Sequence, residues 1–324
     1  MHPLRLVFSV LQPVAPRLAA RWAEQLFFAP PLSRRRSPLT AEGRRLLETG
    51  HAFTVSVGGE RVAAWSWSDH GRDHPAVYLV HGWGSRGGRL AAFVPPLLRA
   101  GVRVITFDAP GHGASEGRLS SMPQFARAFR AVVDAAGPAQ GVIAHSMGAS
   151  ASALAMSWGL TVGRAVFLAP AADPSAFAAQ FAAALGLGPR IMAGMRERSE
   201  RRLAFRWADL NIPTLARGIS APPPLLVFHD RGDAVVPWSD GAAIAAAWPG
   251  PAGGPGGAEL ASSTGLGHRD LVRAPDVVAR AVAFILEGRT PRRGSELPSA
   301  LVPEDVWLER DLFDREARRR RVFS

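Results

Sequence analysis

A serine with the setting of a nucleophile lies in the stretch V-I-A-H-S-M-G, residues 142–148. The apolar run before it is typical of a strand, and the small residues that follow are typical of a closely packed helix. A single residue that joins a strand to a helix makes a tight, strained turn and projects its side chain above the sheet. The pattern therefore favours Ser146 as a nucleophile over a polar residue in an ordinary turn, although Ala144 replaces the first glycine of the usual G-x-S-x-G.

A serine nucleophile needs a base that removes its proton, and the chain has nine histidines. His145 is adjacent to the serine on the tight turn, so its side chain points elsewhere. His81 and His112 lie in glycine-rich corners and are expected to bond locally. His268 follows two glycines in T-G-L-G-H, between the last predicted strand and the last helix. Because that loop is free to place an imidazole, we predict that His268 is the base.

The base in turn needs an acid that fixes its tautomer and stabilises the imidazolium. The stretch L-L-V-F-H-D-R-G-D-A-V-V-P contains Asp230 at a strand end and Asp233 three residues further on. We favour Asp233, because the turn that follows lets it reach the next loop. Asp230 is interpreted as a loop cap, and Asp173 is the reserve candidate. The resulting chain order is serine, acid, histidine.

An attacked carbonyl becomes an oxyanion, which two hydrogen-bond donors must hold. The backbone amide of Met147 is the first candidate, because it opens the helix after the serine and the helix dipole favours negative charge there. The backbone amide of Trp83 is the second candidate. It lies in the glycine-rich corner H-G-W-G, directly after a predicted strand, although that corner could also be an ordinary turn.

Two strand-like segments, 52–57 and 61–67, flank a Gly58-Gly59 turn and predict a hairpin. After them, apolar runs that suit buried strands recur along the chain, and helical patterns lie between most of these runs. This alternation predicts an α/β fold with a mostly parallel, eight-stranded sheet and helices on both faces. The predicted strands are 52–57, 61–67, 76–80, 102–107, 141–144, 165–168, 225–228 and 258–261. The predicted helices are 90–100, 124–136, 149–158 and 240–247.

The segment from about 170 to 221 is too long for a simple crossover and carries helical patterns at 174–185 and 188–209. An insertion of this size at the carboxyl edge of a sheet predicts a helical lid over a site. Phe177, Phe181 and Met192 are the candidates for substrate contacts. The alternative is that they only pack the lid onto the domain.

Three parts are therefore expected along the chain: an N-terminal helical segment (1–50), the main domain (51–287) and a polar, Arg-rich tail (288–324). Leu18, Trp22 and Leu26 recur every four residues, which indicates one apolar stripe on a helix. We expect this helix to dock on its own domain; the alternative is an anchor in a membrane interface.

The chain resembles the α/β-hydrolases, in particular the bacterial serine esterase and lysophospholipase-like group, over roughly residues 52–287. The motifs that carry the resemblance are H-G-W-G (81–84), F-D-A-P-G-H-G-A-S (107–115), A-H-S-M-G (144–148), H-D-R-G-D-A-V-V-P (229–237) and G-L-G-H (265–268). The resemblance implies an α/β-hydrolase fold, an acyl-enzyme mechanism, and no metal or organic cofactor. It also implies that Asp108 and His112 belong to a structural loop near the site.

These inferences predict a serine hydrolase that cleaves a carboxylic ester of a small or lipid-like, apolar substrate. The same three side chains would also serve thioester hydrolysis, acyl transfer or amide cleavage, because the pocket selects the leaving group and the acceptor. A binding protein that kept the fold and lost catalysis is the alternative from another class.

The composition fits a globular enzyme, with 47% hydrophobic residues among 324. The chain has no cysteine, which excludes disulfides and Cys-ligated metals. Its formal net charge is +11, but all 38 basic residues are arginine. That bias indicates a GC-rich genome rather than nucleic-acid binding. The Arg runs at 34–36 and 318–321 are interpreted as solvated tails or linkers, with peripheral membrane contact as the alternative.

No apolar run approaches the roughly 20 residues that span a bilayer. The short apolar stretch near the N-terminus is interrupted by Gln12 and Pro13. This interruption makes it a weak signal-peptide candidate and favours a cytoplasmic location. The sequence leaves the oligomeric state open.

Overall fold

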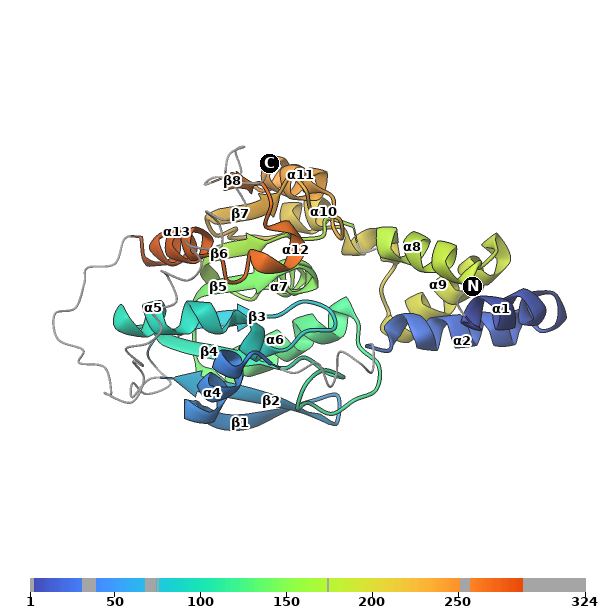
Figure 1. The fold of residues 1–324 in the computed structure, drawn as a ribbon, viewed down its shortest axis with the longest axis horizontal. Helices are drawn as coiled ribbons and strands as arrows, with labels where there is room; N and C mark the ends of the chain where they lie inside the picture. Colours follow the sequence, from blue (N-terminus) through green and yellow to red (C-terminus); the bar gives the residue numbers. More distant parts are fainter. Residues whose placement is uncertain are drawn as a thin grey trace, which may run out of the picture.

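The computed structural model describes residues 3–30, 39–67, 74, 76–173, 175–250 and 257–287, and one eight-stranded sheet lies at its centre (Figure 1). The strand order is β1-β2-β4-β3-β5-β6-β7-β8. The two pairs at the β1 edge are antiparallel, and the five pairs from β4 to β8 are parallel. The predicted fold class, a mostly parallel sheet of eight strands with helices on both faces, is confirmed.

All eight predicted strands are present, with ends that differ by a few residues. They are β1 (His51–Val57), β2 (Glu60–Trp67), β3 (Ala76–Val80), β4 (Arg103–Phe107), β5 (Ala139–His145), β6 (Val162–Leu168), β7 (Leu225–Asp230) and β8 (Ala258–Ser263). The α-helices of the described residues are α1 (Pro3–Val14), α2 (Pro16–Phe28), α4 (Ala41–Thr49), α5 (Val94–Arg99), α6 (Met122–Ala136), α7 (Met147–Ser157), α8 (Ser175–Leu185), α9 (Pro189–Leu203), α10 (Ile212–Arg217), α11 (Trp238–Ala247), α12 (Gly267–Asp270) and α13 (Pro275–Leu286). Two 3₁₀ helices are η1 (Gly87–Phe93) and η2 (Trp207–Leu210).

The central strands are buried on both faces, which explains why they are continuous apolar runs rather than alternating ones. In β3, Tyr78 and Val80 face one hydrophobic cluster, together with α6, α7, α10 and α11. Val77 and Leu79 face the opposite cluster, together with η1, α5 and α13. Successive residues thus serve two separate cores, as the two-residue period of a strand requires.

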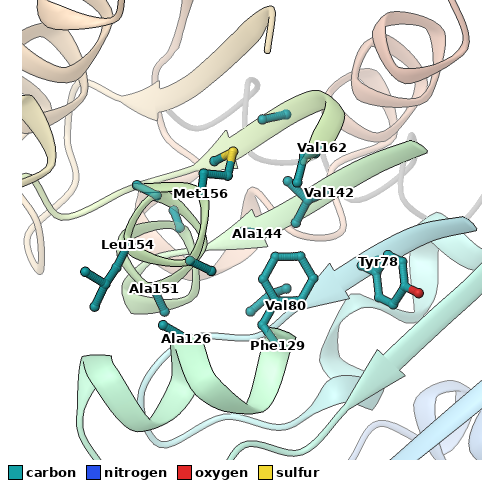
Figure 2. Packing of buried hydrophobic residues seen from close by; sticks show 14 of the residues in the cluster. Tyr78, Val80, Ala126, Phe129, Val142, Ala144, Ala151, Leu154, Met156 and Val162 are labelled. Atoms are coloured by element: carbon teal, nitrogen blue, oxygen red, sulfur yellow. The ribbon is translucent and has the colours of Figure 1, made fainter. Parts of the chain in front are cut away.

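Small residues allow α7 to approach the sheet closely. Ala149, Ala151 and Ala153 of α7 are fully buried between the sheet and α6. Figure 2 shows α7 beside β5, with Ala151 near Ala126 of α6 and with Ala144 at the end of the strand. The close packing fixes the first turn of α7 above the carboxyl end of β5, where the predicted nucleophile lies.

The predicted insertion is helical, and it forms the three helices α8, α9 and α10 with the 3₁₀ helix η2 between α9 and α10. The helical pattern at 188–209 predicts one helix, whereas α9 ends at Leu203. Ala204 then adopts a left-handed conformation with φ of +58°, which an α-helix cannot include. The chain consequently turns, and η2 points back toward the sheet edge.

The insertion does not stand alone, because α8 and α9 pack against the N-terminal pair α1 and α2. We call these four helices the cap. They lie side by side at one end of the molecule, beyond the carboxyl ends of the parallel strands (Figure 1). The cap has its own core, centred on Phe8, Ile191 and Met195. The N-terminal helices thus dock on their own chain, whereas α4 packs against η1 beside the sheet.

Other sequence expectations concern parts of the chain that the structure does not describe. The Arg runs at 34–36 and 318–321 and the tail at 288–324 lie outside the described residues. Within the described ranges, no helix is both long enough and apolar enough to cross a membrane.

An ion-pair network across the cap joins its two helix pairs. Glu24 of α2 keeps 7% of its side chain exposed and accepts hydrogen bonds from Arg198 (3.1 Å) and Arg202 (2.8 Å) of α9. The guanidinium of Arg202 also stacks over the ring of Phe28, 4.6 Å from its centroid. Because both arginines keep over a third of their side chains exposed, water screens part of the attraction.

Replacing Glu24 by glutamine should loosen the cap. The change removes the buried charge that two arginines share, so we expect Glu24→Gln to lower the free energy of unfolding by about 1–2 kcal/mol. Urea denaturation followed by tryptophan fluorescence measures this loss. Glu197→Gln is the matched control, because its ion pair with Arg201 lies on the exposed side of α9. Equal effects of the two substitutions would contradict the network's role.

Candidate active site

Ser146 lies alone between β5 and α7, in the strained turn that its sequence predicts. Its backbone has φ of +53° and ψ of −123°, a conformation that non-glycine residues rarely adopt. The turn has no space for larger neighbours. A Cβ on Gly148 would lie 2.5 Å from the carbonyl oxygen of His81, and one on Gly82 would lie 2.9 Å from the Cβ of Ser146. Ala144 is fully buried in the core, and the turn forms with alanine at that position.

Three predicted side chains form one hydrogen-bonded series at the carboxyl edge of the sheet. Nε2 of His268 lies 3.0 Å from Oγ of Ser146, and Nδ1 of His268 lies 2.8 Å from Oδ2 of Asp233. A carboxylate only accepts hydrogen bonds, so Nδ1 carries the proton and Nε2 accepts from the serine hydroxyl. Residues that are distant in sequence thus meet in the order serine, imidazole, carboxylate.

The Asp233 carboxylate is held rigidly between the two loops. Its side chain is fully buried, and Oδ1 accepts hydrogen bonds from the backbone amides of Val235 (2.8 Å) and Val236 (2.9 Å). Burial by itself raises the pKa of Asp233, but hydrogen bonds from His229, His268 and these two amides outweigh it and hold the pKa far below the ordinary value. The group is therefore ionised throughout the neutral range.

The two other candidate acids have different partners. Asp230 accepts hydrogen bonds from the amides of Gly232 (2.9 Å) and Leu266 (3.0 Å) and from the hydroxyl of Ser263 (2.8 Å). It thereby ties the loop after β7 to the loop that carries the imidazole. Asp173 accepts from the amide of Ser175 at the start of α8 (2.8 Å). Neither carboxylate bonds the imidazole.

The histidines that were expected to bond locally do so. His81 donates from Nδ1 to the carbonyl oxygen of Gly82 (2.7 Å), and its Nε2 accepts from the amide of Ala109 (2.9 Å). His112 accepts from the amide of Gly84 (3.0 Å). These bonds lock the H-G-W-G corner onto the neighbouring glycine-rich loop.

Asp108 holds the same loop from the inside. Its Oδ1 accepts from the amide of Gly87 (2.8 Å), and its Oδ2 accepts from the amide of Ala114 (2.8 Å). A Cβ on Gly113 would overlap this carboxylate, at 1.8 Å from Oδ2. Burial raises the pKa of Asp108. The contacts of Asp108 fit the structural role that the resemblance implies.

His145 points away from the serine, as its position on the turn predicts, and supports the imidazole from behind. Its Nε2 donates to the backbone carbonyl oxygen of His268 (2.9 Å), and the centroids of the two rings are 4.8 Å apart. Burial, with a smaller contribution from the charge of His268, lowers the pKa of His145 to about 3. The ring therefore stays neutral and holds the loop at its base. Nothing in the sequence pattern predicted this contact.

A cavity of about 650 Å³ opens over Ser146 between the sheet edge and the cap. Trp83 and Met147, whose amides are the predicted oxyanion donors, line it beside the serine. Phe177 and Phe181 of α8 line it as predicted. Met192 does not line the cavity; it packs in the cap core. Within the described part of the chain, no group of three or more His, Asp or Glu side chains is arranged to hold a metal ion.

Sequence reasoning missed the other aromatic side chains of the cavity wall. Phe27 and Phe28 at the end of α2 and Trp207 of η2 line the cavity. The rings of Phe27 and Trp207 are stacked at 5.8 Å, and the rings of Phe27 and Phe181 meet edge to face at 5.3 Å. The adjacent pair Phe27-Phe28 at the end of an amphipathic helix was the available signal. Its place over the serine depends on how α2 docks.

Residues 77–323 match the family described as the alpha/beta hydrolase family. Because this match spans most of the chain, the chain belongs to that family, and the resemblance of its motifs to α/β-hydrolases is confirmed.

Curated relatives and solved structures agree with this membership. The chain is 34% identical to the 2-hydroxy-6-oxononadienedioate/2-hydroxy-6-oxononatrienedioate hydrolase of Escherichia coli O81 over 128 residues, which are 37% of this chain and 44% of that protein. It thus matches less than half the length of such relatives. Esterase Pf2001 from Pyrococcus furiosus superposes with a TM-score of 0.57 at 18% identity, over 80% of this chain and 96% of that chain.

A second solved structure, esterase RhEst1 from Rhodococcus sp. ECU1013, superposes with a TM-score of 0.51 at 18% identity, over 74% of this chain and 99% of that chain. At these identities the likeness shows a shared fold.

The buried histidines should make the protein less stable in mild acid. Burial keeps His145 and His81 neutral in the folded state, because it holds both pKa values well below 6.5. The unfolded chain protonates both below its ordinary pKa, so stability should fall as the pH drops below about 6.5, by up to about 1.4 kcal/mol per pH unit for each histidine. Urea denaturation at about pH 7.5 and about pH 5 measures the loss, above the range in which carboxylates titrate.

His145→Gln should remove one of these two contributions and flatten the dependence on pH. His51→Gln is the control, because His51 is exposed on β1 and the substitution should leave the pH profile unchanged. A profile of His145→Gln that follows the wild type would show that this ring is not held neutral by the fold.

Proposed function

We propose that the protein is a serine hydrolase that cleaves carboxylic esters with an apolar acyl group. The observation that carries the proposal is the hydrogen-bonded series from Ser146 through His268 to Asp233, which opens into a cavity with mostly apolar walls. A structural role for the serine would explain neither its strained backbone nor the imidazole above it.

In the first half of the reaction, Oγ of Ser146 attacks the ester carbonyl carbon while Nε2 of His268 takes the hydroxyl proton. The carbonyl oxygen becomes an oxyanion, which the backbone amides of Trp83 and Met147 hold. The amide of Met147 is free for this role, because the first N–H of a helix has no partner within the helix. The imidazolium then gives its proton to the leaving alcohol, and the acyl group stays on the serine.

In the second half, water replaces the alcohol. Nε2 of His268 takes a proton from water, and the hydroxide attacks the acyl carbon. The second oxyanion collapses, the acid leaves, and the proton returns to Ser146. Throughout, the charge of Asp233 stabilises the imidazolium and fixes Nδ1 as the protonated nitrogen. A carboxylate with a depressed pKa suits this role, because it stays ionised beside a positively charged ring.

The walls of the cavity favour an apolar group beside the reacting carbonyl. Phe27, Phe28, Phe181 and Trp207 form its cap side, and such rings gain free energy by excluding water from a bound hydrocarbon. A cavity of about 650 Å³ lies within the ordinary range for small-molecule sites. The lid function of α8 and α9 belongs to this proposal, as the side of the cavity that closes over the acyl group.

Ser146 should be the site of covalent labelling. A fluorophosphonate probe should attach to the wild type at this residue, as mapped by peptide mass spectrometry. Ser146→Ala should lose the label and at least about a thousandfold of the kcat for p-nitrophenyl esters. Ser85→Ala is the control, because Ser85 also lines the cavity and should keep both. Equal rates for Ser146→Ala and wild type would refute esterase catalysis at this site.

Asp230 at the end of β7 and Asp233 in the loop after it should give clearly different losses of kcat in the same assay. Asp233→Asn removes the charge beside the imidazole and disturbs its tautomer, so kcat should fall by about a hundredfold or more. Asp230→Asn weakens loop contacts only, so the remaining folded enzyme should keep most of its kcat while the melting temperature falls. If Asp230→Asn lost more kcat than Asp233→Asn, the acid role would belong to Asp230.

A further inference from the structure

Exposed large apolar side chains are concentrated on one part of the described chain. Five of the six lie on the N-terminal helix pair: Leu6 (60% exposed), Val7 (44%), Val10 (63%), Val14 (79%) and Leu18 (54%). The sixth, Val235, is 42% exposed and lines the cavity. Scattered exposed apolar residues need no explanation, but a concentration on adjoining helices does.

Only part of the apolar surface of α1 is buried in the cap. Phe8 is fully buried, and the nearby Leu4 and Leu11 pack with it in the cap core. Leu6, Val10 and Val14 are spaced by four residues, so they form one stripe on the opposite side. A contiguous aliphatic stripe on the exposed side of a helix marks an interaction surface more often than a surface that meets only water. Among the described residues, nothing covers this second stripe, which therefore points to a partner.

The exposed charged side chains of the helix pair α1 and α2 are all of one sign. Arg5, Arg17 and Arg21 are exposed on α1 and α2. Glu24 is the only acidic residue of the two helices, and it is buried and paired with α9. The exposed surface of the pair thus combines aliphatic side chains with cations and no anion. This combination suits an anionic lipid surface, where each nearby arginine adds attraction and aliphatic side chains enter the headgroup boundary.

The same charges argue against a second copy as the partner. A twofold interface would place this surface against itself, which would bring together six arginines and no acidic group. The chain as a whole carries a formal net charge of +11, so two copies repel each other at a distance as well. Docking on an anionic membrane involves neither the repulsion between the arginines of two copies nor the repulsion between two positively charged chains.

The helix α2 connects the exposed apolar surface of the helix pair with the cavity. The helix α2 carries Leu18 on the exposed side, while Phe27 and Phe28 at its other end line the cavity. From Leu18 to Phe27 the helix rises by about 14 Å. One rigid helix thus joins the exposed apolar surface to the wall above Ser146.

We propose that the outer side of α1, with Leu6, Val10, Val14 and the arginines of α2, docks on an anionic membrane surface and positions the cavity to take an acyl substrate from the lipid. The docking itself does not depend on catalysis. The supply of substrate rests on the proposed ester hydrolysis.

Vesicle flotation of the full chain tests the docking. The wild type should float with vesicles of phosphatidylcholine and phosphatidylserine, and much less with phosphatidylcholine alone or at high salt. Leu6→Gln/Val10→Gln should lower the bound fraction about tenfold. Arg17→Gln/Arg21→Gln should lower it about tenfold on the anionic vesicles and remove most of the salt dependence. Arg196→Gln/Arg201→Gln, which removes two exposed arginines of α9, is the matched control and should bind like the wild type.

Two further measurements separate the docking from the proposed chemistry. Ser146→Ala should float like the wild type. Leu6→Gln/Val10→Gln should keep the wild-type melting temperature and the rate on a soluble short-chain ester, and lose rate only on an ester embedded in anionic vesicles. A wild type that floats with neither vesicle type would overturn the proposal. So would a wild-type dimer in light scattering that Leu6→Gln/Val10→Gln converts to a monomer, because the stripe would then be a contact between copies.

Discussion

The strained backbone of Ser146 is the constraint on which the rest of the site depends. A residue with φ of +53° stores about 1–3 kcal/mol of strain, which surrounding contacts must hold in place. Those contacts are unusually close, since Gly148 and Gly82 leave no room for a Cβ. They exist because small residues bring α7 against the sheet and because β3 ends beside β5. The core packing of Figure 2 thus sets the position of the hydroxyl.

Around this turn, three polar side chains together position the imidazole of His268. Asp233 orients the ring from one side, His145 holds its backbone from the other, and Asp230 ties down the loop that leads to it. Asp230 and Asp233 accept hydrogen bonds at both carboxylate oxygens, and His145 donates one from Nε2, so together they stabilise one arrangement of the loop. The ring can then exchange a proton with the serine without any rearrangement of the loops.

Sequence reasoning located what depends on local pattern and missed what depends on docking. Continuous apolar runs predicted the strands from β3 onward, and a hairpin pattern predicted β1 and β2. Turn chemistry distinguished Ser146, His268 and Asp233 from other residues of their types. The helices of the insertion were predicted, but their packing with α2 was not. The stacking of Phe27 on Trp207 joins residues 180 positions apart in numbering, which no local pattern shows. The prediction that Met192 contacts the substrate was not met by its position for the same reason. The pattern shows that its helix is amphipathic but not which neighbour covers the apolar side of the helix.

The cap therefore differs from the sheet in which segments of the chain form its core. An insertion in an α/β fold can pack on the sheet edge alone. Here α8 and α9 instead form a hydrophobic core with α1 and α2. That arrangement makes the cavity wall depend on two distant segments, joined through Glu24 and two arginines. It also leaves α1 with one side in the cap and one side outside it. The outer, aliphatic side is not used in folding, and the exposed arginines of the same helix pair carry positive charge. Together these two features are the basis of the proposed docking on an anionic surface.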